Sequence, residues 1–174
     1  GFREDFYHRV CGGHLRDVLD TLVYVKRETD VWLELTTLLI PGENDSDGEL
    51  HRASAWVVEN LGPDVPIHFT AFHPDWKMRD KPGTSPESLT RARSIALRNG
   101  LRYVYTGNVH DAPGGTTYCH VCEAPLIVRD WYQLLEWNVS PAGRCARCDT
   151  PVAGHFDAVP GDWGPKRRPV RLAR

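Results

Sequence analysis

Apolar residues recur at two spacings in the first 110 residues of the chain, and the two spacings alternate. Positions three or four residues apart are apolar in segments 15–23, 50–61 and 89–96, as on one face of a helix. Short runs rich in Val, Leu, Ile and Thr follow each of them, at 31–40, 67–72 and 101–106. The pattern predicts helix, strand, helix, strand, helix, strand, which is typical of a parallel sheet with right-handed crossovers.

Turn and cap residues mark the ends of these elements. Pro41-Gly42 stops the first strand, and Ser85-Pro86-Glu87 combines an N-cap, a proline at the first helical position and an acid in the first turn. Three parallel strands leave both edges of a sheet open, which makes a poor domain. We therefore expect this part of the chain to be half of a larger α/β sheet or of a partial barrel.

The composition changes at Ala112, where helical periodicity ends and the chain becomes rich in aromatic residues and cysteines. We expect three parts: an α/β part at 1–111, a small β-rich four-cysteine ribbon at 112–155, and a basic tail rich in Pro and Gly at 156–174. A module of about forty residues has too small a core to fold readily alone. The ribbon therefore needs a stabilising device of its own.

Two Cys-x2-Cys pairs supply that device. They are formed by Cys119, Cys122, Cys145 and Cys148. Paired thiolates suit the tetrahedral coordination of structural zinc, and metal binding then contributes to the folding of the ribbon. Iron in a rubredoxin-type site takes the same ligands and stays open as the alternative, whereas two disulfides are disfavoured in a reducing compartment.

The bulk composition excludes several classes of protein. The formal charge is −2, with 41% hydrophobic and 25% charged residues, so no overall basic excess favours nucleic acid. The apolar runs are short, so we expect no membrane span. We see no secretory leader and expect a cytoplasmic protein.

A few polar residues in or just after the strands are candidates for function, because parallel sheets and barrels bind ligands at the carboxyl ends of their strands. Glu34 lies in an apolar strand and must be paired or face a ligand cavity. Thr36 is a second candidate, although the preference of threonine for β-strands also explains its presence there. His73 directly follows the second strand, and Asn44 lies in the loop after the first. An ion pair for Glu34 and a structural role for His73 stay open.

The chain resembles the C-terminal half of radical SAM enzymes of the AmmeMemoRadiSam group, which are similar to the pyruvate formate-lyase activating enzyme. The resemblance covers about 2–152 and rests on the runs EDFYHRVCGGHLRDVLDTL, VWLELTTLLIPGENDS, IHFTAFHPDWKM, GLRYVYTGNV and TYCHVC…CARC. It implies strands four to six of a partial (β/α)6 barrel, followed by a zinc ribbon. It also implies a family chemistry in which a [4Fe-4S] cluster cleaves S-adenosylmethionine to a 5′-deoxyadenosyl radical that abstracts hydrogen from a substrate.

The resemblance carries over to this chain only in part. The Cys-x3-Cys-x2-Cys loop that holds the cluster in the family is absent here and would precede Gly1. We therefore expect this chain alone to lack radical chemistry. The resemblance implies that His73 lies near the bound nucleoside, that Glu34 and Thr36 line the S-adenosylmethionine cavity, and that Asn44 flanks its mouth.

Two other classes of function remain open. One is a non-catalytic zinc-ribbon module that binds protein or, less favoured by the charge, nucleic acid. The other is a metal-dependent hydrolase that uses the histidines. For the radical enzyme, the sequence does not identify the substrate; a protein activated as a glycyl radical is one option. We also expect the open edge of the half-barrel to promote self-association.

Overall fold

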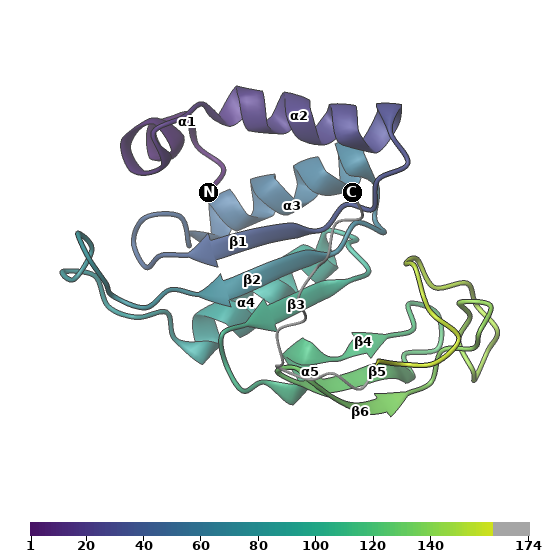
Figure 1. Cartoon of the computed structure of the whole chain (residues 1–174). Helices are drawn as coiled ribbons and strands as arrows, with labels where there is room; N and C mark the ends of the chain where they lie inside the picture. Colours follow the sequence, from purple (N-terminus) through teal and green to yellow (C-terminus); the bar gives the residue numbers. More distant parts are fainter. Residues whose placement is uncertain (162–174) are drawn as a thin grey trace, which may run out of the picture. The chain divides into compact units, whose positions relative to one another are not determined.

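The structure is a computed structural model that describes residues 1–161, so the expected basic tail lies outside the described residues from residue 162 onward. The chain divides into two compact units, the first Gly1–Gly115 and the second from Thr116 onward. Figure 1 shows the helices and the parallel strands of the first unit, and the antiparallel strands of the second. Within the described residues, no helix combines the length and hydrophobicity that crossing a bilayer requires.

The first unit is an α/β sheet whose strands follow one another in chain order. Its main elements are α2 (Leu15–Glu28), β1 (Leu35–Leu39), α3 (Asp47–Leu61), β2 (Ile67–Ala71), α4 (Pro86–Arg98) and β3 (Val104–Gly107). The three strands are parallel in the order β1-β2-β3, with Leu35, Ile67 and Val104 in register. The alternation of helix and strand predicted from the sequence is confirmed.

Helix α4 begins at Ser85, the cap residue that the sequence indicates, and α3 begins at a second serine cap. Ser46 accepts a hydrogen bond from Glu49 N at the start of α3, and Ser85 accepts one from Ser88 N at the start of α4. After α3, Gly62 has a φ of 92°, a conformation that favours glycine. These caps satisfy backbone groups that a helix end otherwise leaves without partners.

The core lies on one face of the sheet, beneath α3 and α4. A single apolar cluster contains Leu39 and Phe69 from the strands, Leu50 from α3 and Leu89 from α4. Side chains alternate between the two faces along a strand. In β1, Thr36 and Leu38 therefore point to the face opposite that of Leu39, and both are exposed there. The sheet therefore buries one face under helices and presents polar and apolar side chains on the other.

Several elements differ from the sequence-based expectation. Strand β1 begins at Leu35 rather than at residue 31. Leu35 N donates to the carbonyl of Pro66, and because Pro66 has no N–H, the pairing with the second strand does not extend toward residue 31. Strand β3 likewise begins at Val104 rather than at residue 101. The segment before α2 forms a short helix, α1 (Glu4–Phe6), and a π-helix (Tyr7–Cys11), which apolar periodicity did not indicate.

The second unit is a three-stranded antiparallel sheet beside the cysteine pairs. Its strands are β4 (Thr117–Tyr118), β5 (Pro125–Asp130) and β6 (Gln133–Trp137), in the order β4-β5-β6. The helical turn α5 (Ala112–Gly115) precedes it in the first unit. Strands β5 and β6 form an antiparallel hairpin between the two cysteine pairs, so the separate β-rich unit expected from the sequence is present.

Candidate metal centre

The four cysteines of the ribbon converge on one point. Their Sγ atoms all lie within 4.8 Å of one another, with Cys119 to Cys148 at 3.5 Å and Cys122 to Cys145 at 3.7 Å. Four sulfurs about 2.3 Å from one zinc in a tetrahedron lie about 3.8 Å apart. All four are free thiols, and the separations are far longer than a disulfide bond of about 2.0 Å. The arrangement could therefore bind a metal ion such as zinc.

The two cysteine pairs have the same backbone structure. In each pair the first cysteine N–H bonds to a carbonyl five residues ahead, Cys119 to Ala124 and Cys145 to Thr150, both at 2.9 Å. The residue after the second cysteine returns a bond of 2.9 Å to the carbonyl of the first. That residue is Glu123 or Asp149, each with a φ of 58°. The turn thus takes the left-handed conformation of a glycine without containing one.

The electrostatics of the thiols indicate what a bound cation would do at this cluster. Hydrogen bonds from the Thr150 side chain and backbone lower the pKa of Cys148 to about 6. The pKa of Cys122 is instead raised to about 12, because burial and the three neighbouring cysteines outweigh the backbone hydrogen bond from Ala124. Adjacent thiolates repel one another, so a divalent cation is what allows all four to ionise together.

Among residues 1–161, these cysteines are the one group of three or more metal-ligand side chains that converge. The group contains no histidine, so His120 and His155 are not part of it. Closed coordination by four thiolates is typical of a structural site rather than of an open catalytic one. The structure therefore gives no support to a hydrolase that uses the histidines around a second metal.

Glu34 lies beside a partner that the sequence did not indicate. Its carboxylate accepts hydrogen bonds at 2.8 Å from Trp32 Nε1 and lies 2.8 Å from His68 Nε2. The His68 ring stacks on Tyr105, with centroids 4.9 Å apart. Register explains the grouping, because Thr36, His68 and Tyr105 are neighbours across the three strands. Glu34 thus lies just before β1 with an exposed side chain, not inside a buried strand, and its neighbours are Trp32 and His68 rather than the lysine or arginine of an ion pair.

The other predicted site residues fall at different places. His73 is exposed just after the carboxyl end of β2, and Thr36 is exposed on β1. Asn44 is buried with 2% exposure; its side chain accepts from Ile40 N and donates to Leu38 O, so it holds the turn after β1. His73 and Asn44 therefore lie at the carboxyl ends of the strands, whereas Glu34 lies at the opposite end of β1.

A charge cluster at the carboxyl end of the sheet was missed by sequence reasoning. The buried carboxylate of Glu43 lies 2.7 Å from Arg9 and 2.7 Å from Lys81, and its backbone carbonyl accepts from Arg3. The hydrogen bonds from Arg9 and Lys81 lower the pKa of Glu43 to about 2. The only signal in the sequence was an acid directly after Pro41-Gly42, and its partners lie in two distant segments.

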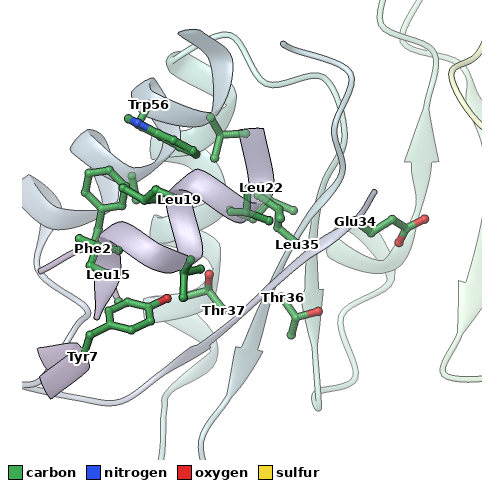
Figure 2. Close-up of a pocket in the computed structure, with 15 residues that line it drawn as sticks. Phe2, Tyr7, Leu15, Leu19, Leu22, Glu34, Leu35, Thr36, Thr37 and Trp56 are labelled. Carbon is green, nitrogen blue, oxygen red and sulfur yellow. The ribbon is translucent and has the colours of Figure 1, made fainter. Parts of the chain in front are cut away.

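An apolar cavity of about 240 Å³ lies between α2, α3 and β1. Figure 2 shows Phe2, Leu15, Leu19 and Trp56 around it, with Glu34 and Thr36 pointing away from α2. Helix α2 has no fully buried residue, in contrast to α3 and α4. The first unit is therefore incompletely packed along the outer side of β1.

No family model matches the chain. The chain is similar to the uncharacterized protein MJ0808 of Methanocaldococcus jannaschii, with 43% identity over 149 residues. The matched segment is 85% of this chain but 44% of that protein. This chain thus spans less than half the length of the curated relative that it matches.

Proposed function

We propose that this chain is the C-terminal part of a radical SAM enzyme similar to the AmmeMemoRadiSam group. Its α/β unit contributes three strands of a partial barrel, and its ribbon binds structural zinc. The longer enzyme would hold a [4Fe-4S] cluster and S-adenosylmethionine through a Cys-x3-Cys-x2-Cys loop outside this chain. The hydrogen donor is a substrate for which a protein, activated as a glycyl radical, is one option.

The observation that carries the proposal is the winding of the sheet. The strand order β1-β2-β3 follows the chain order, and the core formed with α3 and α4 lies on one face. A barrel needs this arrangement, because each crossover must advance the sheet in the same direction. A doubly wound sheet instead reverses its strand order and carries helices on both faces. The motifs quoted for the resemblance supply the reaction class.

In this proposal His73, exposed after β2, contacts the nucleoside, and Thr36 faces the interior of the barrel from β1. Glu34 acts on the same face, where it orients His68 through a contact of 2.8 Å. Asn44 is assigned an indirect role, because its amide holds the turn after β1 through Ile40 and Leu38. This turn fixes the loop that would flank the mouth of the site.

A cleavage assay tests the proposal. The longer protein, reconstituted with iron and sulfide under anaerobic conditions and reduced with dithionite, should convert S-adenosylmethionine to 5′-deoxyadenosine. This 174-residue chain should give none. His73→Ala in the longer protein should weaken S-adenosylmethionine binding, while the control His51→Ala, at a histidine that is also exposed, should not. A longer protein that has no Cys-x3-Cys-x2-Cys loop, or product from this chain alone, would refute the assignment.

For the ribbon we propose zinc rather than iron. Zinc has no preferred geometry from its d electrons and fits four thiolates as a structural site. Elemental analysis of protein purified from zinc-supplemented and iron-supplemented cultures should find one zinc per chain in both. A red protein with iron in the four-cysteine site would instead support the rubredoxin-type alternative.

A second candidate, a protein-binding ribbon, is favoured by the exposed tip of the β5–β6 hairpin. Trp131, Tyr132 and Leu135 are 51%, 66% and 54% exposed, although such residues usually form the core of a small module. The described ribbon residues 116–161 carry five carboxylates against three arginines, which does not suit a phosphate backbone. Binding of a partner protein that is lost in Trp131→Ala and Tyr132→Ala, without any upstream cluster loop, would support this candidate.

A further inference from the structure

We propose that Glu43 is a positioning residue for the candidate ligand site. Through its contact with Lys81 it fixes the connection between β2 and α4, residues 72–85, which carries His73 and Trp76 and which we call the His73 loop. The role of this loop in binding S-adenosylmethionine rests on the proposed function. Its attachment to Glu43 does not, because the attachment follows from contacts within the α/β unit.

Glu43 lies in a turn that its neighbours hold in place. Asn44 accepts a hydrogen bond from Ile40 N and donates one to Leu38 O, and Glu43 N donates to Ile40 O at 3.0 Å. The Glu43 residue itself is only 9% exposed. A carboxylate that is largely removed from water is stable only with charged or hydrogen-bonded partners. The Glu43 side chain is therefore a fixed anionic point at the carboxyl end of β1.

The carboxylate of Glu43 divides its two oxygens between two segments of the chain. Lys81 Nζ lies 2.7 Å from Oε1, and Arg9 Nη2 donates to Oε2 at 2.7 Å. Arg9 belongs to the π-helix (Tyr7–Cys11) before α2, whereas Lys81 belongs to the His73 loop. Hydrogen bonds between charged groups are the strong ones. Glu43 thus ties the His73 loop to the end of β1, with its second oxygen held by the N-terminal segment.

The other attachments of the His73 loop lie at its base and near its middle. Thr84 N donates to Phe72 O at 3.0 Å, Phe72 N donates back to Thr84 Oγ1 at 2.9 Å, and this hydroxyl donates to Leu39 O at 2.5 Å. Met78 packs against the apolar cluster that contains Phe72. A loop whose ends meet and whose own side chains pack is an Ω-loop, a form that is frequently functional. Between Met78 and Thr84, the contact of Lys81 with Glu43 is what attaches the loop.

These attachments leave the first part of the loop presented to solvent. Trp76 is 76% exposed and has a φ of 44°, which bulky residues rarely adopt. Lys77 Nζ lies 4.4 Å from the centroid of the Trp76 ring, and His73 is exposed. Strained residues persist where the surrounding structure fixes them, and they cluster at functional sites. The anchored loop therefore holds His73 and Trp76 at the carboxyl end of β2, where sheets of this class bind ligands.

Limited proteolysis of this 174-residue chain tests the attachment. Trypsin cuts after Lys77 and Arg79 but not after Lys81, which is followed by Pro82, so variants at Lys81 keep the cleavable bonds of the loop. Lys81→Met keeps a long side chain and removes its charge. It should speed cutting after Lys77 and Arg79 by about 10-fold or more, because the loop opens more often. Lys81→Arg should restore the rate of the wild type, since arginine donates to the same carboxylate.

Val65→Ala is the matched control. Val65 is 2% exposed in the core just before β2, at the opposite end of this strand from the His73 loop. Its truncation lowers the stability of the whole unit, whether the loop is closed or locally open. The rate of cutting in the loop should therefore stay that of the wild type. A wild-type rate in Lys81→Met, or equal acceleration in Val65→Ala or in Lys81→Arg, would overturn the attachment.

Binding of S-adenosylmethionine to the longer protein tests the positioning role. Titration calorimetry should show weaker binding in Lys81→Met by roughly 3- to 10-fold, with recovery in Lys81→Arg. If Lys81→Met binds like the wild type while His73→Ala binds weakly, the positioning role is wrong and the proposed function stands. Unchanged binding in both Lys81→Met and His73→Ala would overturn the positioning role together with the assignment of His73.

Discussion

The two units of this chain solve the problem of stability in different ways. The α/β unit buries one continuous apolar cluster between its sheet and the helices α3 and α4. The ribbon has few fully buried apolar residues and brings four thiols within 4.8 Å of one another. One unit therefore depends on packing, and we propose that the other depends on a bound metal ion. Changes that distinguish these two sources of stability should affect one unit and spare the other.

The largest expected effect is loss of the ribbon on removal of the metal. Structural zinc contributes about 10–16 kcal/mol of apparent binding free energy in comparable small modules, so chelation or Cys119→Ser should unfold the ribbon. The α/β unit should keep its helical circular dichroism. Metal content and thermal melting would be measured together. Cys11→Ser is the control, because Cys11 is exposed and lies outside the cluster; a ribbon that stays folded without metal would contradict the comparison.

The converse change is a cavity in the core of the α/β unit. Leu89 of α4 has no exposed surface, and Leu→Ala at such a position costs about 2–5 kcal/mol. Leu89→Ala should lower the stability of the α/β unit to denaturant without releasing zinc. Val31→Ala is the control, since Val31 is 65% exposed and its truncation should have little effect. Loss of zinc in Leu89→Ala would show that the two units do not fold independently.

A third test uses a change of pH, which should affect the stability of the α/β unit through Glu43. Glu43 has its pKa lowered from 4.5 to about 2 by Arg9 and Lys81. The stabilising contribution of a carboxylate with a lowered pKa is present above the unfolded value and is lost as pH falls toward the folded one. The α/β unit should therefore lose stability between about pH 4.5 and pH 2.

Glu43→Gln should remove this acid dependence and destabilise the α/β unit by about 1–3 kcal/mol at pH 7, since Arg9 and Lys81 lose their partner. Denaturant unfolding at several pH values would measure it. The control is Glu59→Gln, a helix residue outside this charge cluster that is exposed. Parallel pH profiles for the wild type and Glu43→Gln would contradict the assignment of the acid sensitivity to Glu43.

The sequence predicted some of these features much better than others. The ribbon ligands could be identified from spacing, because two Cys-x2-Cys pairs bring four thiols together whatever the intervening chain does. The cap Ser85, followed by a proline and an acid, was likewise a local signal. The contact of Glu34 with His68 could not be found in this way, because the two residues are 34 positions apart and meet only through strand register.

The charge cluster of Glu43 shows the same limit in another form. Its partners Arg9 and Lys81 come from the π-helix and from the loop after β2, and neither segment has an apolar period that fixes its position. Sequence patterns report which face of an element is buried. They do not report which polar side chains meet where several loops converge, and functional sites of α/β proteins are formed at such places.

The smallest effect concerns the turns of the ribbon, where the residue after each cysteine pair is not a glycine. Glu123 and Asp149 both have a φ of 58°, which costs about 1–2 kcal/mol for a residue with a side chain. Glu123→Gly should therefore stabilise the zinc-bound ribbon by up to about 1 kcal/mol, as a small rise in melting temperature. Asp149→Gly should gain less, because Asp149 also accepts a hydrogen bond from Arg144 at 2.9 Å. Glu136→Gly in β6 is the control and should destabilise, since glycine weakens a strand interior. If Glu123→Gly and Glu136→Gly destabilised the ribbon equally, the left-handed turn would not be the strained part of this site.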